Sequence, residues 1–234
     1  MENKRVVIAI IVIIILIVGI ISGAYFFSGF SNKQTKLLTD ETNKILQADI
    51  TTENIDLDIK SSKNYAVVEK AIKEYVSELK NIYVEMDELN KGINPNNIFT
   101  ADNIEDKDLS EIDDIINEYK EKSQDAVTKL ESLLTEEKIA ENINKRNIST
   151  RRDYYTELYN TIMSSDNMKK QYNGLEEKIK DEKSKLSEKL KQINNISEFL
   201  KKNSDSWNIK DGKIQFTNLN RMTEYYTLLN KLTD

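Results

Sequence analysis

The feature that most constrains this sequence is an uninterrupted apolar segment, Val6–Phe27, which contains no charged side chain. At ~1.5 Å per residue it would form a helix of roughly 33 Å, about the thickness of a bilayer's hydrocarbon core. The segment therefore predicts a single transmembrane helix. A signal peptide cleaved after Ala24 is the alternative, but such peptides have an apolar region of only about 7–15 residues, and Val6–Ile21 is already longer.

The charges beside this segment predict its orientation. Lys4 and Arg5 directly precede it, and positive residues favour the cytoplasmic side of a membrane. We therefore expect a cytoplasmic tail at 1–5, a transmembrane signal anchor at 6–27 and an extracytoplasmic remainder. Gly19 and Gly23 have the spacing that lets two membrane helices approach closely. Glycine is common in membrane helices, however, so the pair can equally have no role.

Beyond the anchor, the composition is typical of long helices. The whole chain has six Gly and one Pro, and both residues are unfavourable inside helices. We predict a mainly α-helical fold with a juxtamembrane helix and linker at 28–61, an elongated helical bundle or coiled coil at 62–203, and a β-hairpin with a terminal helix at 204–234. Within the linker, Ile55, Leu57 and Ile59 alternate with charged residues, which indicates an extended segment or a short strand.

A heptad pattern marks the first long helix, at about 62–90. Its apolar residues recur three and four positions apart, which predicts the seam of a coiled coil or a bundle. They are Tyr65, Val68, Ile72, Tyr75, Leu79, Ile82, Met86 and Leu89. Gly92 follows this pattern, so we expect it to end the helix in a left-handed conformation.

Two further helical stretches follow. One is predicted from Asp108 to about Lys145, with acidic residues in its first turn. The next would be capped by Ser149 or Thr150 and would extend to about residue 202. It should break either near residue 164 or near Gly174, and the pattern does not distinguish these positions.

The C-terminal region has a different pattern. Asp211-Gly212 predicts a two-residue type I′ turn that joins two short strands. Pairing Lys210 with Lys213 would place one apolar face on the hairpin, made of Trp207, Ile209, Ile214 and Phe216. A final amphipathic helix is expected after residue 217, with its apolar stripe formed by Leu219, Met222, Tyr226 and Leu229.

The composition argues against several classes of function. The net charge is −6, whereas nucleic-acid binding usually needs a concentrated basic face. The chain has no Cys and no His, so it lacks disulfides, thiol chemistry, the commonest metal ligand and the commonest general base. Asp102, Asp106, Asp108 and Asp113 have calcium-loop spacing, but Lys107 occupies the position that requires glycine. We predict no catalytic residue, no metal, no cofactor and no enzymatic activity.

Charged and aromatic groups in the helical region have two interpretations each. The acidic stretch 95–137 and the basic stretch 178–202 are expected to be neighbouring helices with complementary charges, or else an acidic surface for a cationic partner. Tyrosines at 154, 155, 159 and 172, and Trp207, are expected in the core, although each could form a ligand platform.

These patterns together predict a single-pass bacterial envelope protein with an extracytoplasmic helical domain. The bias toward Ile, Lys and Asn is the basis for a bacterial source. We expect a non-catalytic scaffold, or a subunit of an envelope assembly, that binds a protein partner or a second copy through its helices. The alternative is an extracytoplasmic ligand-binding module for a cell-wall fragment, a peptide or an ion. A carboxylate-based hydrolase is a third and weaker alternative.

Overall fold

The structure is a computed structural model that describes residues 29–233. Of these residues 76% are helical, and one small antiparallel sheet lies near the C-terminus, so the predictions of a mainly helical bundle and of a C-terminal hairpin are confirmed. The predicted tail, the predicted anchor and its Gly19 and Gly23 lie outside the described residues. Within residues 29–233, no helix has the length and apolarity needed to cross a membrane.

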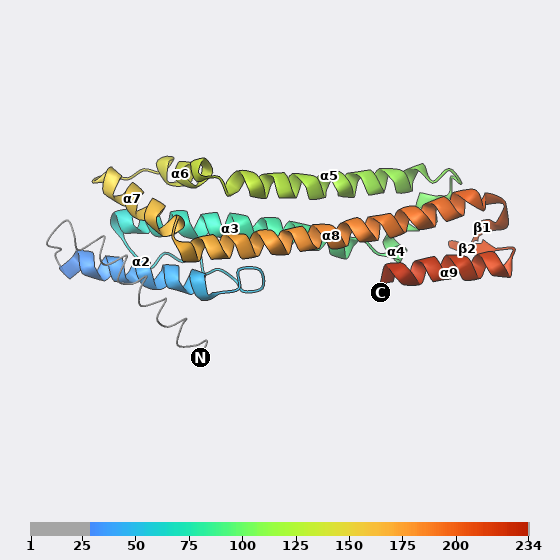
Figure 1. Cartoon of the computed structure of the whole chain (residues 1–234), viewed down its shortest axis with the longest axis horizontal. Coiled ribbons are helices and arrows are strands. Elements are labelled where there is room, and N and C mark those ends of the chain that lie inside the picture. Colours follow the sequence, from blue (N-terminus) through green and yellow to red (C-terminus); the bar gives the residue numbers. More distant parts are fainter. Residues whose placement is uncertain (1–28, 234) are drawn as a thin grey trace. The chain divides into compact units, whose positions relative to one another are not determined.

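Eight α-helices, two short 3-10 helices and one hairpin make up the described chain (Figure 1). In chain order they are α2 (Gly29–Gln47), α3 (Lys63–Gly92), α4 (Pro95–Ile98), η1 (Asp102–Ile104), α5 (Ser110–Leu133), α6 (Glu136–Asn144), α7 (Arg152–Met163), α8 (Asp166–Lys202), η2 (Ser204–Ser206), β1 (Trp207–Lys210), β2 (Lys213–Phe216) and α9 (Leu219–Thr233).

The chain forms two compact units. Among the described residues, unit 1 contains 29–81 and 131–176, and unit 2 contains 82–130 and 177–233. Helices α3, α5 and α8 therefore contribute residues to both units. Each unit has its own buried apolar side chains: α2, α3, α7 and the start of α8 supply those of unit 1, while α5, the rest of α8, the hairpin and α9 supply many of those of unit 2.

The hairpin of unit 2 has the predicted register. Trp207 pairs with Phe216, Ile209 with Ile214, and Lys210 with Lys213. Asp211 and Gly212 both have positive φ, at 52° and 70°, as a type I′ turn requires. The Asp211-Gly212 pair therefore predicted the turn correctly, and the alternation of apolar and polar residues in the two strands predicted their pairing.

Helix boundaries differ from the prediction in the middle of the chain. The single helix expected from 108 to 145 is two helices, because Thr135 caps α6 by accepting a hydrogen bond from the Lys138 N–H at 3.3 Å. The open question about the next break is resolved at Ser164, since α7 ends at Met163 and α8 continues through Gly174. The expected caps Ser149 and Thr150 precede Arg151, which takes the capping position with φ 51° and no side-chain bond.

Two local predictions are wrong in detail, and a third had two alternatives. Gly92 is the last residue of α3, as expected, but it lacks positive φ. A Cβ atom there would lie 2.7 Å from the Tyr119 hydroxyl, so close packing explains the glycine. Of the two alternatives for residues 54–60, the strand is not formed: these residues contain no helix, turn or bend and pair with no described strand. In α9, Tyr225 and Leu232 are buried, whereas Leu219 and Tyr226 of the expected stripe are 71% and 51% exposed, because the hairpin contacts the helix on another face.

Candidate functional site

The heptad seam of α3 is buried as predicted, except at its end. Seven of the eight seam residues, Tyr65 to Met86, are at most 3% exposed. Leu89 is only half-buried, and its neighbour Asn90 is buried instead. In unit 2, the Asn90 amide donates to the Glu182 carbonyl at 2.7 Å, and Lys189 donates to the Asn90 carbonyl. The last turn of α3 is thus joined to α8 by polar contacts rather than by a leucine.

A network of buried charges in unit 1 was not predicted from the sequence. The Lys73 ammonium lies 2.5 Å from a Glu41 carboxylate oxygen and 2.9 Å from one of Glu69. Its third donated bond goes to the Asp58 carbonyl at 2.7 Å. The three charged side chains are at most 5% exposed. Lys73 therefore connects α2, α3 and the 58–61 segment with every one of its donors used.

The carboxylates of this network are also fully occupied. Glu69 accepts hydrogen bonds from the backbone N–H groups of Lys60 and Ser61 and from the Ser61 hydroxyl, the last at 2.6 Å. Glu41 receives a second ion pair, from Lys44. Buried charges are tolerated when such pairing compensates their desolvation. The sequence did not indicate a buried network, because Glu69 and Lys73 are four residues apart and resemble an ordinary exposed helical pair.

These contacts shift the pKa values of the network in opposite directions. Burial alone would raise the pKa of Glu69, but the Ser61 and Lys60 hydrogen bonds and Lys73 outweigh it and hold that pKa below its usual 4.5. The pKa of Glu41 is lowered in the same way against burial, by Lys44 and Lys73. The pKa of Lys73 lies above 10.5, since the two carboxylates outweigh its desolvation. All three groups therefore stay ionised at neutral pH.

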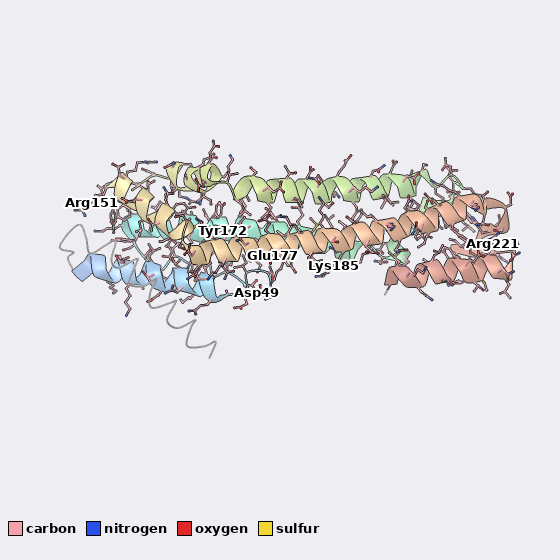
Figure 2. All side chains as sticks on the ribbon, in the orientation of Figure 1. Asp49, Arg151, Tyr172, Glu177, Lys185 and Arg221 are labelled. Atoms are coloured by element: carbon pink, nitrogen blue, oxygen red, sulfur yellow. The ribbon has the colours of Figure 1, made fainter. Side chains whose placement is uncertain are left out.

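Several tyrosines contribute to the core of unit 1 beside its aliphatic side chains. The ring of Tyr65 meets that of Tyr155 edge-on at 5.1 Å, and Tyr75 meets Tyr172 at 6.3 Å. Tyr172 projects from the first part of α8 (Figure 2) and is 6% exposed. Tyr159 accepts a hydrogen bond from the Asn142 amide at 2.8 Å, and burial raises its pKa to about 12. Of the four tyrosines expected in the core, Tyr159 and Tyr172 are buried, whereas Tyr154 and Tyr155 are half-buried.

Trp207 is held in the same manner in unit 2. It is 0% exposed, and its indole N–H donates to the Leu200 carbonyl at 2.9 Å. The Lys107 ammonium lies 5.0 Å from the ring centroid and donates to the Trp207 carbonyl. Phe216, the cross-strand partner, packs on Phe199 and Tyr225, while Ile209 and Ile214 are half-buried. These contacts leave no free indole face for a ligand.

The acidic and basic stretches meet within unit 2. Lys201 of α8 forms an ion pair with Asp113 of α5 at 2.7 Å, and Lys183 donates to Gln124 at 2.7 Å. Among the described residues, no three acidic side chains are arranged to hold a metal ion, and this includes the four aspartates with calcium-loop spacing. One ion pair and one hydrogen bond therefore join the two stretches within unit 2.

Unit 1 also contains a cavity of about 600 Å³. Leu134, Ile139, Ala140, Met163 and Tyr172 supply its apolar wall. Polar side chains at its rim come from α6, α7 and α8, and include Glu136, Asn160, Lys169 and Asn173. The cavity lies beside the α5–α6 and α7–α8 connections. It is therefore formed at helix breaks whose positions the sequence did not define. Its volume is within the range of small-molecule sites.

Comparisons with protein-family models, with curated proteins and with solved structures found no significant match.

Proposed function

We propose that the chain is a membrane-anchored, non-catalytic helical scaffold of a bacterial cell envelope, with residues 1–5 in the cytoplasm and the helical bundle outside. The observation that carries the proposal is the segment Val6–Phe27, which is long enough to span a bilayer and follows Lys4 and Arg5 directly. A helical bundle attached to such an anchor is suited to hold or position another envelope component.

The buried charges of unit 1 support a structural role rather than catalysis. A general base needs a free position next to a substrate, whereas Lys73 has all three donated bonds satisfied and Glu69 accepts from Ser61 and Lys60. The groups that are most deeply buried and ionised are thus committed to one another. This arrangement favours a chain that keeps a fixed shape over one that transforms a substrate.

The scaffold would bind its partner or a second copy through α9. The α3 seam is buried within the chain itself, so it is not free for another helix. Leu219 and Tyr226 of α9 lie one heptad apart and are the most exposed large apolar side chains of unit 2. Seven residues bring them to the same helical face, which supports coiled-coil-type association there.

Photo-crosslinking in intact cells tests this proposal. A photoreactive amino acid at Tyr226 should give a discrete crosslinked product whose second component can be identified by mass spectrometry. Glu224 is a matched control, since it is exposed on the same helix and points about 200° away from Tyr226. Equal yields at both positions, or no product at either, would contradict the proposed face.

The cavity in unit 1 favours a second candidate function, a ligand-binding module for a cell-wall fragment or a peptide. A soluble muropeptide should then raise the Tm of the full chain in a saturable manner. Ala140→Phe would fill part of the cavity and should remove that rise. A Tm that is unchanged by muropeptides and by short peptides would leave the scaffold as the better proposal.

A further inference from the structure

The linker between α2 and α3 contains a segment that has the properties of a strand without a partner. Residues 54–60 run without a helix, a turn or a bend. Ile55, Leu57 and Ile59 alternate with Asp56, Asp58 and Lys60. Leu57 is 51% exposed and Ile59 is 37% exposed, which is unusual for two large apolar side chains so close in sequence.

One side of this segment is already bonded to α3. The Asp58 carbonyl accepts from Lys73 at 2.7 Å, and the Lys60 N–H donates to Glu69 at 3.0 Å. In an extended chain, successive residues direct their N–H and C=O groups to alternate sides. The Asp58 carbonyl and the Lys60 N–H therefore face α3, the Asp58 N–H donates to the Asp56 carboxylate at 2.9 Å, and we expect the groups of residues 55, 57 and 59 to face away.

The outward groups are unpaired in the structure. Among the described residues, no hydrogen bond uses the backbone N–H or C=O of Ile55, Leu57 or Ile59. Three consecutive outward positions form the kind of free edge that accepts an added strand. A shallow cavity of about 470 Å³ lies beside the segment. Ile59, Ala66 and Val67 form its apolar part, which would receive an apolar side chain, and Lys70, Arg146 and Asn147 form its polar part.

Charge selects among the possible occupants. Antiparallel pairing of two copies centred on Leu57 would place Asp56 directly opposite Asp58 twice, and like charges at opposed positions are destabilising. Asp58 has an 82% exposed side chain and Asp56 a 54% exposed one. The Lys60 ammonium lies 3.3 Å from Asp56 and 3.2 Å from Asp58, so the three side chains together carry one net negative charge. Opposite the two aspartates, Lys or Arg would be favourable, while apolar residues would face Ile55, Leu57 and Ile59.

We infer that residues 54–60 are a docking edge for an extended segment of a partner protein in which basic and apolar residues alternate, bound by β-strand addition. Backbone hydrogen bonds to residues 55, 57 and 59 would hold the segment, and Asp56 and Asp58 would select its basic residues. This edge belongs to unit 1 alone and is independent of membrane anchoring and of the α9 face.

A synthetic peptide of eight residues in which lysine and valine alternate is the direct probe. It should bind the full chain, kept in detergent micelles, at least tenfold more tightly than a peptide of the same composition with four valines followed by four lysines. Binding is measured by fluorescence anisotropy of labelled peptides at two salt concentrations. Equal binding of the two peptides would show attraction between charges alone and would overturn the inference.

Variants of the chain separate the backbone contribution from the side-chain contribution. Leu57→Pro removes one outward N–H that has no partner within the protein, and it should reduce binding at least tenfold. Leu57→Ala is the matched control, because it keeps the N–H and should reduce binding less. Asp58→Asn should weaken the salt dependence. If Leu57→Pro binds like the unmodified chain, strand addition is wrong.

Amide hydrogen exchange keeps the test decisive if Leu57→Pro disturbs the fold. Addition of the alternating peptide to the unmodified chain should slow exchange at Ile55, Leu57 and Ile59. Exchange at Lys60, whose N–H already donates to Glu69, should change little. Unchanged exchange at the three outward amides under saturating peptide would contradict the inference, as would a dimer of the full chain that Leu57→Pro dissociates.

Discussion

Replacing Lys73 with methionine should be among the most damaging single changes in unit 1. Lys73→Met keeps most of the side-chain volume but removes the ammonium that pairs with Glu41 and Glu69, at 2.5 and 2.9 Å. Both carboxylates would remain in places where they are at most 5% exposed. Loss of one partner from a buried ion pair costs about 3–5 kcal/mol, and we expect a loss of this size.

Lys70→Met is the matched control on the same helix. The Lys70 side chain is 57% exposed, and its ammonium lies 3.6 Å from Glu74. Such an exposed pair contributes about 0–1 kcal/mol. Urea unfolding of the full chain in mild detergent, followed by circular dichroism at 222 nm, measures both variants. A Lys73→Met chain that is as stable as the Lys70→Met chain would refute the structural role of the network.

The effect should also depend on pH with a defined sign. In the unmodified chain the pKa values of Glu41 and Glu69 are below 4.5, so their contribution is complete above pH 4.5 and is lost as the pH falls through the lowered values. In Lys73→Met, Glu69 loses its pairing with Lys73 while Glu41 keeps its ion pair with Lys44, so burial should raise the pKa of Glu69 more than that of Glu41. Lowering the pH from about 7 to about 5 should therefore reduce the difference in stability between the two chains. A difference that grows would contradict this reasoning.

Three further predictions follow from single residues. Because Trp207 is fully buried, its fluorescence should be blue-shifted and weakly quenched by iodide, and Trp207→Ala should destabilise unit 2 by about 3–5 kcal/mol, measured by urea unfolding. Gly174→Ala should stabilise the chain by about 1 kcal/mol, because no atom lies within 4 Å of the added Cβ. Gly212→Ala should destabilise it by about 1 kcal/mol, because φ is +70°. Thermal unfolding of the two variants distinguishes these opposite signs. Burial raises the pKa of Tyr159 from its usual 10.0 to about 12. The stability that this group contributes is therefore complete below pH 10.0 and is lost as the pH rises toward 12. Absorbance at 295 nm follows the ionisation of tyrosine over this range.

The sequence predicted those parts of the fold that depend on local pattern. The spacing of Tyr65 to Met86 identified the buried face of α3, because a heptad stripe on a long helix has little alternative to a core. The turn at Asp211-Gly212 determined the hairpin register, because few residue pairs adopt positive φ at both central positions.

The remaining features depend on tertiary contacts that no local pattern contains. Glu69 and Lys73 resemble an exposed pair until α2 brings Glu41 onto them. Gly92 ends α3, but the reason for a glycine there is the approach of Tyr119, which only the tertiary structure shows. In α9, two apolar stripes compete, and the hairpin decides that Tyr225 rather than Tyr226 is buried. The cavity of unit 1 could not be predicted, because it depends on a helix break at Thr135 that the pattern did not indicate and on a break at Ser164 that was one of two predicted positions.

Protease accessibility tests the proposed membrane topology, and with it the proposed function, most directly. Proteinase K is added to intact spheroplasts of cells that express the full chain with a C-terminal epitope tag, and a cytoplasmic protein serves as the control for lysis. A bundle held outside the membrane by Val6–Phe27 predicts loss of the tag while the cytoplasmic control stays intact. A tag that is degraded only after lysis, or a chain that is released without detergent, would contradict the proposal.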